Sequence, residues 1–159
     1  MSYGSSKAMD WIKGEEESIH LLGKAYKAGV NFFDTANMYS NGESERVLGK
    51  AIIQHKMSRP RIVVATKLFF PIMPTVNEFA PSKKQLVENS YDSRFINEWG
   101  LSRKHIMEAI QGCLKRLQLD YIDLLQIHRF DPVSTIINTV IYKYVIYRYT
   151  MSIGSYNIY

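Results

Sequence analysis

The sequence predicts an α/β fold with a parallel sheet. Three short apolar runs alternate with segments whose apolar residues recur at helical spacing, in the order helix, strand, helix, strand, helix, strand. Neighbouring parallel strands need crossover connections of this kind, and these are usually helices. The alternation therefore favours one domain in which helices cover a parallel sheet.

The first helix is expected to begin at Glu15 and to end near Gly29. Glutamates occupy positions 15–17, where a helix N-terminus favours negative charge, and glycine is a typical helix stop. An apolar stripe along this segment consists of Ile19, Leu22 and Tyr26. A short strand follows and gives way to Asp34.

The second helix is expected from about Glu45 to Ile53, with Ser44 as its N-cap. Its apolar residues would face the sheet. The second strand is the apolar run 62–66, which stops on Lys67.

A long loop is expected between residues 68 and 101. The apolar period fails there, and prolines interrupt the chain at 71, 74 and 81. A loop at the carboxyl end of a strand is where α/β enzymes shape a substrate pocket. Tyr91, Phe95 and Trp99 would either line such a pocket or pin the loop to the body of the domain, and both possibilities stay open.

The third helix is expected to open at Ser102 and to run to about Leu117, followed by a strand over 121–127 that stops on His128. In a parallel sheet the carboxyl ends of neighbouring strands lie at one edge. Asp34, Tyr39, Lys67 and His128 are therefore expected to converge.

These four groups suit the reduction of a carbonyl. A phenol beside an ammonium donates its proton more readily, so Tyr39 would be the acid and Lys67 would activate it. Asp34 would hold that ammonium, and His128 would orient the substrate oxygen. Each residue alone also has a structural explanation, as a turn, an ordinary aromatic, a strand end or a hydrogen-bonded histidine. The joint pattern is what indicates a site.

Three motifs are similar to those of the aldo-keto reductase family. They are Asp34-Thr35-Ala36-x-x-Tyr39 with its continuation to Gly49, the strand that ends on Lys67, and the segment 117–128 that leads to His128. The segments 1–4, 39–42 and 126–131 most resemble its fungal aryl-alcohol dehydrogenase-like branch.

The resemblance implies a (β/α)₈ barrel that uses NADPH to reduce a small-molecule carbonyl. It implies Tyr39 as the acid, Asp34 and Lys67 as its supporting pair, His128 as the orienting residue, and a cofactor contact for Asp34. A complete barrel needs roughly 250 residues, whereas this chain has 159. We therefore expect residues 1–131 to form about the first half of the barrel, most of its first strand excepted.

Residues 132–159 form a tail of different composition. They contain no Asp, Glu, Ala or Leu and are rich in Ile and Tyr, which favours strand over helix. The tail is expected to be unstructured or to reflect an error in the gene sequence. Because the rest of the cofactor site would be missing, the chain alone is expected to be inactive. The alternative is a non-catalytic fragment, or a binding or regulatory half barrel that self-associates through its open edges.

Composition indicates a cytoplasmic protein with no signal peptide and no membrane span. The single cysteine, Cys113, cannot form an internal disulfide. The net charge of +5 is dispersed among acidic residues through position 131, which argues against nucleic-acid binding. The four histidines have no metal-ligand spacing, and no glycine-rich phosphate loop is present. No metal is expected.

Overall fold

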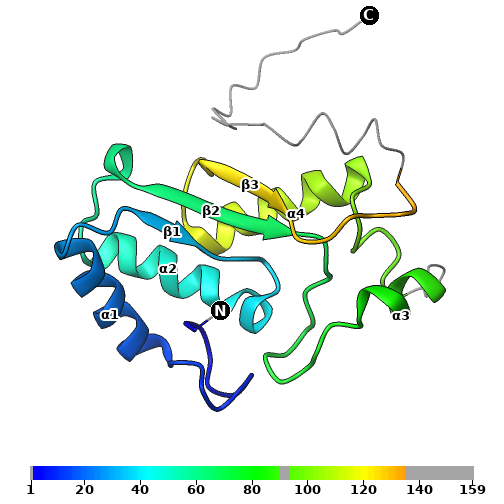
Figure 1. The fold of residues 1–159 in the computed structure, drawn as a ribbon, viewed down its shortest axis with the longest axis horizontal. Helices are drawn as coiled ribbons and strands as arrows, with labels where there is room; N and C mark the ends of the chain where they lie inside the picture. The colour runs from blue at the N-terminus through cyan, green and yellow to red at the C-terminus, as the bar shows by residue number, and fades with distance from the viewer. Residues whose placement is uncertain (1, 90–93, 135–159) are drawn as a thin grey trace, which may run out of the picture.

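The computed structural model of the chain describes residues 2–89 and 94–134. Three strands, β1 (Phe32–Asp34), β2 (Val63–Leu68) and β3 (Leu124–Ile127), form a sheet in the order β1-β2-β3 (Figure 1). Both pairs of strands are parallel. The prediction of a parallel sheet is confirmed.

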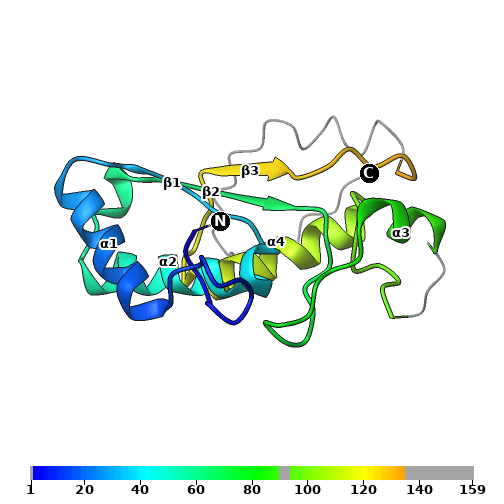
Figure 2. The ribbon, with the colours of Figure 1, turned by 60° about the horizontal axis from the view of Figure 1, so that its bottom comes forward.

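Three long helices, α1 (Glu15–Lys27), α2 (Glu43–Gln54) and α4 (Arg103–Leu117), lie on the same side of this sheet (Figure 2). Helix α2 packs against both α1 and α4. Shorter helices follow at η1 (Tyr39–Gly42), η2 (Arg59–Arg61) and α3 (Lys83–Glu88). The described residues therefore form two layers, with helices on one face of the sheet.

The two faces of the sheet differ in burial because side chains alternate along each strand. The covered face carries Phe33, Val64, Thr66 and Leu68, all buried. On the opposite face Phe32 is 50% exposed and Leu124 is 39% exposed. The described residues place no helix over that face, which we call the open face.

The second helix begins about two residues before the predicted start at Glu45. Helix α2 begins at Glu43 after Gly42, whose φ of 90° is left-handed and favours glycine. Ser44 is not the cap: its hydroxyl lies inside the helix and accepts a hydrogen bond from Thr35 Oγ1 at 2.9 Å. The third helix was expected to open at Ser102, and α4 begins one residue later, at Arg103. Ser102 is its N-cap, because its Oγ accepts a hydrogen bond from the His105 amide.

The segment 68–101 is not wholly a loop, because it contains α3. Ser82 and Gln85 form a reciprocal capping box at the start of this helix, which the neighbouring Pro81 and the polar composition had concealed. Leu86 is its one buried residue, and it packs into a second apolar cluster around Phe69 and Leu101. The helix anchors the loop to the body of the domain.

The strands also differ from the prediction at their ends. Strand β2 continues through Leu68, so Lys67 lies within the strand and not after it. Strand β3 begins at Leu124 and not at Tyr121. The carboxylate of Asp123 accepts from the Val64 amide at 2.8 Å and from Arg59 at 2.5 Å, and these bonds take the place of strand pairing there. The Asp123 amide still donates to the Val64 carbonyl at 3.1 Å, and the regular ladder with β2 begins at Leu124.

The predicted tail lies almost entirely outside the described residues, which stop at 134. Among the helices of the described ranges, none has the length and apolar character needed to cross a membrane.

Candidate active site

Two of the predicted site residues, Asp34 and Lys67, form an ion pair at the carboxyl ends of the strands. Lys67 Nζ lies 2.5 Å from Asp34 Oδ2 and 2.7 Å from the Thr35 carbonyl oxygen. The Lys67 side chain is 15% exposed, whereas that of Asp34 is 45% exposed. Adjacent parallel strands place the two residues side by side, so the ammonium is held at a fixed point at the edge of the open face.

A strained turn presents Tyr39 to this ammonium. Ser40 and Asn41 have φ values of 48° and 50°, in the left-handed region that side chains disfavour. The Asn41 side chain compensates by donating to the carbonyls of Thr75 and Glu78, both at 2.7 Å. The turn is thus tied to the long loop after β2.

The phenol of Tyr39 lies close to two of its predicted partners. Lys67 Nζ is 3.4 Å from the Tyr39 hydroxyl and 4.9 Å from the ring centroid. The His128 ring meets the Tyr39 ring edge-on, with centroids 5.6 Å apart. The structure therefore brings Asp34, Tyr39, Lys67 and His128 together, as the position of the strand ends predicts.

His128 is half-buried directly after β3. Its amide donates to the Leu68 carbonyl at 2.9 Å, and its ring also packs edge-on against Phe70. Burial, then the neighbouring positive charges of Lys67 and Arg129, lower its pKa below the ordinary value of 6.5. The imidazole is therefore neutral at neutral pH. Within the described residues its Nδ1 atom is buried and has no hydrogen-bond partner.

Gln126 belongs to this site and was missed from the sequence. Its Nε2 donates to Asp34 Oδ1 at 2.9 Å, so both carboxylate oxygens of Asp34 are engaged. The register pairs Lys67 with Gln126 across β2 and β3. The signal was available, because Gln126 lies two positions before His128 and strand side chains alternate with a period of two.

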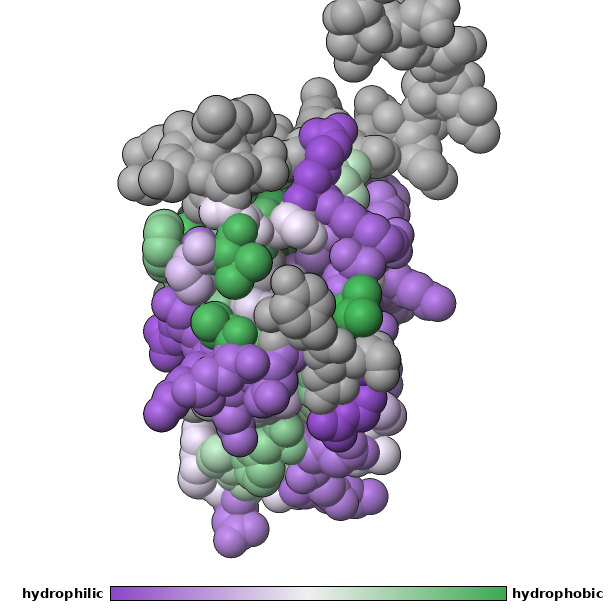
Figure 3. Space-filling model, turned by 90° about the vertical axis from the view of Figure 1, so that its right-hand side faces the viewer, coloured by the Kyte–Doolittle hydropathy of each residue, from purple (hydrophilic) through white to green (hydrophobic). Residues whose placement is uncertain are grey.

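An apolar pocket of about 270 Å³ opens beside Tyr39 and His128. Its walls come from the N-terminal segment, the strained turn and the loop after β2, with aromatic side chains from Trp11, Phe70 and Phe79. Glu78 and Arg129 are the charged residues among those that line it. Viewed from the end to which β2 and β3 point, hydrophobic side chains lie among hydrophilic ones (Figure 3). The pocket suits a largely apolar molecule with one polar group.

Of the three aromatic residues considered from the sequence, Phe95 and Trp99 do not line this pocket. Trp99 packs edge-on against Phe69 with ring centroids 5.9 Å apart, and Phe95 packs on the same apolar cluster. Of the two possibilities, these residues fulfil the second, since they pin the loop to the domain. Tyr91 lies outside the described residues.

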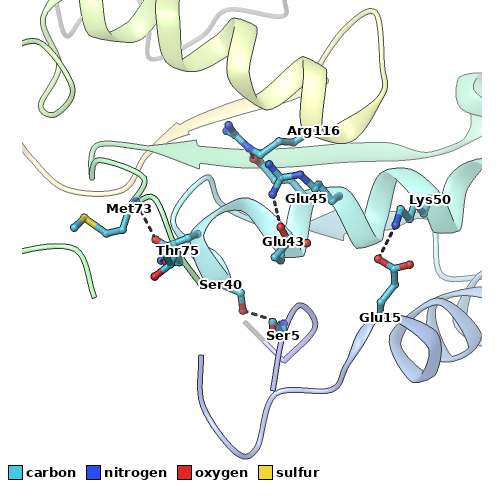
Figure 4. A network of polar contacts seen from close by, with 11 residues as sticks. Ser5, Glu15, Ser40, Glu43, Glu45, Lys50, Met73, Thr75 and Arg116 are labelled. Atoms are coloured by element: carbon cyan, nitrogen blue, oxygen red, sulfur yellow. Dashed lines mark hydrogen bonds and ion pairs between the residues drawn. The ribbon is translucent and has the colours of Figure 1, made fainter. Parts of the chain in front are cut away.

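A buried polar network supports the site from the helix side. Glu45 is fully buried and accepts from Thr66 Oγ1 and from Arg116 Nε, both at 2.6 Å. Figure 4 shows Glu45 and Arg116 facing each other, and Ser5 beside Ser40. The network joins α2, β2 and α4, and so fixes the strand that carries Lys67.

Among the residues that the structure describes, no three His, Cys, Asp or Glu side chains are grouped as a metal site would require. Cys113 is buried on α4, and burial raises the pKa of its thiol well above the ordinary range.

Comparison with known sequences identifies a family. Residues 1–146 match the Aldo/keto reductase family. The chain is 44% identical over 137 residues to aldo-keto reductase AFTS1 of Alternaria alternata, which covers 83% of this chain and 37% of that protein. It is 40% identical over 131 residues to versiconal hemiacetal acetate reductase of Aspergillus parasiticus, covering 82% and 37% of the two chains.

A Schizosaccharomyces pombe protein that carries the name of an aryl-alcohol dehydrogenase is 42% identical over 135 residues, with 83% of this chain and 38% of that one covered. Among solved structures, the holo form of aldo-keto reductase AKR11C1 from Bacillus halodurans matches with a TM-score of 0.57 and 29% identity. That match covers 81% of this chain and 35% of the other.

The chain thus spans a little over a third of the length of the relatives it matches. Its three parallel strands and their helices fit part of a (β/α)₈ barrel. The predicted resemblance to fungal aldo-keto reductases and aryl-alcohol dehydrogenases is confirmed. The chain belongs to the aldo-keto reductase family.

Proposed function

We propose that this chain carries the proton-donating part of an NADPH-dependent site that reduces aldehydes or ketones to alcohols. One observation carries the proposal: the Tyr39 hydroxyl lies 3.4 Å from an ammonium that is itself held by Asp34, with His128 against the same ring. Proton donation to a developing alkoxide needs such a group. The family supports the assignment.

Tyr39 would give its proton to the carbonyl oxygen. The Lys67 ammonium stabilises the phenolate that forms, and Asp34 fixes the position of that ammonium. Because Lys67 also donates to the Thr35 carbonyl, it cannot move away from Tyr39 without losing two contacts. The ion pair acts by holding charge in place before the reaction.

His128 would orient the carbonyl. A buried N–H without an acceptor is rarer in proteins than a buried lone pair without a donor. Since Nδ1 has no partner among the described residues, the proton of the neutral ring belongs on Nε2. The Nε2–H group then serves as a hydrogen-bond donor to the substrate oxygen.

NADPH, when bound, would supply the hydride. The residues present fit it in part: the Asp34 carboxylate lies at the open face, 45% exposed, and a carboxylate there can accept a hydrogen bond from a ribose hydroxyl. The described residues include no glycine-rich phosphate loop. We expect other contacts to the cofactor to come from segments corresponding to the remaining length of the relatives.

The substrate would be an aromatic aldehyde or its alcohol. The pocket beside Tyr39 is walled by Trp11, Phe70 and Phe79, and aromatic rings pack favourably edge-on or offset against one another. The name of the Schizosaccharomyces pombe relative agrees with this substrate class.

Two proteins test the proposal. In the first, residues 2–131 of this chain replace the matching segment of the Aspergillus parasiticus reductase, and NADPH consumption with versiconal hemiacetal acetate is followed by absorbance. We expect this chimera to turn over. In the second, the 159-residue chain alone is expected to show no turnover above its Tyr39→Phe variant. A folded but inactive chimera would contradict the assignment.

A second candidate function is a non-catalytic half barrel that associates with another copy of itself. The exposed Phe32 and Leu124 on the open face favour it, because apolar surface of this kind is usually covered by a partner. Sedimentation velocity distinguishes the candidates: a concentration-dependent dimer that Phe32→Ser and Leu124→Ser together abolish would support self-association, and a monomer would exclude it.

A further inference from the structure

The strained turn before α2 contains the dipeptide Asn41-Gly42, which the proposed reaction does not use. Among the asparagines of the chain, Asn41 alone is followed by glycine. The backbone nitrogen of the next residue can attack an asparagine side chain, and glycine leaves that nitrogen unobstructed because it has no Cβ. Asn41 is therefore the most reactive asparagine that the sequence offers.

The reaction is deamidation, and its only co-reactant is water. The Gly42 nitrogen bonds to the side-chain carbonyl carbon of Asn41 and loses its proton to the amide nitrogen, which leaves as ammonia. Water then opens the resulting five-membered imide at either carbonyl, and nothing is oxidised or reduced. One product is aspartate, which carries a carboxylate in place of the amide. The other is isoaspartate, which lengthens the backbone by one carbon.

Three hydrogen bonds hold the Asn41 side-chain amide in place. Its Nδ2 donates to the Thr75 and Glu78 carbonyls, both at 2.7 Å, and its Oδ1 accepts from the Met73 amide at 3.3 Å. Met73 and Thr75 lie together beside the turn (Figure 4). A side-chain amide nitrogen has two N–H donors, and both are used here. Before this nitrogen leaves as ammonia, both of its bonds to the loop after β2 must break.

The segment 73–78 of that loop is closed by contacts between two of its own residues. Thr75 Oγ1 donates to Glu78 Oε1 at 2.8 Å, and the Glu78 amide donates to the Thr75 carbonyl at 3.3 Å. Both residues are exposed, so water competes for these bonds. The two carbonyls that hold Asn41 thus belong to a surface segment that can open locally without unfolding of the sheet.

We propose that Asn41 is a modification site whose deamidation is gated by the segment 73–78. While the segment is closed, the amide persists. When it opens, the Gly42 nitrogen reaches the freed side chain and Asn41 deamidates. The aspartate product has no N–H donor for the Thr75 and Glu78 carbonyl oxygens and repels them, so the segment does not close again.

Deamidation also changes the candidate active site. The left-handed φ values of Ser40 and Asn41 are compensated by the contacts to the segment 73–78. The same turn presents Tyr39 to Lys67. Loss of these contacts therefore releases the turn that positions the phenol. This consequence rests on the proposed function, whereas the modification itself does not.

Peptide mapping by mass spectrometry follows Asn41 in the 159-residue chain during incubation at mildly alkaline pH. One sample is folded in buffer and the other is unfolded in urea. We expect Asn41 to react at least about tenfold more slowly in the folded chain, because its hydrogen bonds must break first. Asn77 lies in the same segment but is followed by glutamate. It is the internal control and is expected to react little in either sample.

Two glutamate variants test the gate. Glu78→Ala removes the side-chain contact that closes the segment, and we expect deamidation in the folded chain to become about threefold faster, with no change in urea. Glu108→Ala removes another exposed glutamate, which pairs with Lys104 on α4, and is expected to leave the rate unchanged. Circular dichroism confirms that each variant is folded.

Two aspartate variants test what the modification does. Asn41→Asp imitates the product, and Asn77→Asp adds the same charge to the same segment at an exposed position. Hydrogen exchange of the Glu78 amide, which donates to Thr75, reports whether the segment is closed. We expect it to be at least about fivefold faster in Asn41→Asp and unchanged in Asn77→Asp.

The proposal is overturned if Asn41 deamidates equally fast in the folded and unfolded chains, or if Glu78→Ala and Glu108→Ala behave alike. It is also overturned if exchange of the Glu78 amide is the same in Asn41→Asp and Asn77→Asp. None of these readouts uses NADPH or turnover, so failure of the proposed reaction would leave them unaffected.

Discussion

The two faces of the sheet have different roles. The covered face packs against the helices, and the open face carries polar residues of the candidate site. On the covered face, apolar side chains and the buried Glu45–Arg116 pair join the sheet to the helices. On the open face, Asp34, Lys67 and Gln126 form a polar row beside exposed apolar residues. The strands are the same, so the difference arises only from which way each side chain points.

This division explains how a small part of a barrel can keep its site geometry. The carboxyl ends of β1 and β2 are positioned by contacts made on the covered face, and Tyr39 by a turn tied to the loop after β2. None of these contacts involves the open face. The site is therefore preorganised before anything covers it, while stability depends almost entirely on the other side.

Adjacent phenylalanines on β1 provide the strongest test of this difference. Phe33 is 5% exposed on the covered face and Phe32 is 50% exposed on the open one. Phe33→Ala is expected to lower the free energy of unfolding by about 4 kcal/mol, and Phe32→Ala by less than about 1 kcal/mol. Urea denaturation measures both. Equal losses would show that the open face is buried in solution.

The next largest effect on stability is expected for the buried ion pair between Glu45 and Arg116. Glu45→Ala leaves the Arg116 side chain, which is 13% exposed, without its partner. We expect a loss of about 3 kcal/mol in the free energy of unfolding. Glu43, two positions before Glu45, forms a surface pair with Arg46. Glu43→Ala removes this pair and is expected to cost less than about 1 kcal/mol. If the two variants unfold at the same urea concentration, the network does not stabilise the covered face.

Close packing between α2 and α4 is tested by Gly49→Ala. An added Cβ would lie 2.3 Å from the Leu117 carbonyl oxygen, so the helices would have to separate. Against the helix propensity gained, we expect a net loss of about 2 kcal/mol. Gly14→Ala, where a Cβ meets nothing within 4 Å, should change thermal unfolding little. A neutral Gly49→Ala would mean that this contact is loose.

Lowering the pH is expected to lower the free energy of unfolding because His105 is buried. Because burial lowers its pKa in the folded chain from 6.5 to about 4, the unfolded chain binds more protons below pH 6.5. Stability therefore falls as the pH drops, by about 2 kcal/mol between pH 7 and pH 5. Urea unfolding at the two pH values measures this loss, which should shrink in His105→Leu and persist in His20→Leu.

Much of this arrangement could be predicted from the sequence. Strand order, the parallel sheet and the convergence of Asp34, Tyr39, Lys67 and His128 all follow from apolar runs that end on polar residues. Such patterns are local, and the rule that parallel strands share a carboxyl edge converts them into a site.

Other features depend on contacts between distant segments. The left-handed turn at Ser40 and Asn41 is compensated by carbonyls more than 30 residues away. Helix α3 buries a single apolar residue, so it has no apolar period to detect. Sequence spacing carries no information about such meetings.

The most direct measurement is the rate of carbonyl reduction by the chimera with and without the Tyr39 hydroxyl. We expect Tyr39→Phe to lower kcat at least about 100-fold with an unchanged circular dichroism spectrum. Tyr121→Phe removes a phenol oxygen before the opposite end of β3 and should leave kcat unchanged. If Tyr39→Phe retained the parent kcat, the phenol would not be the proton donor and the assignment of this site would be wrong.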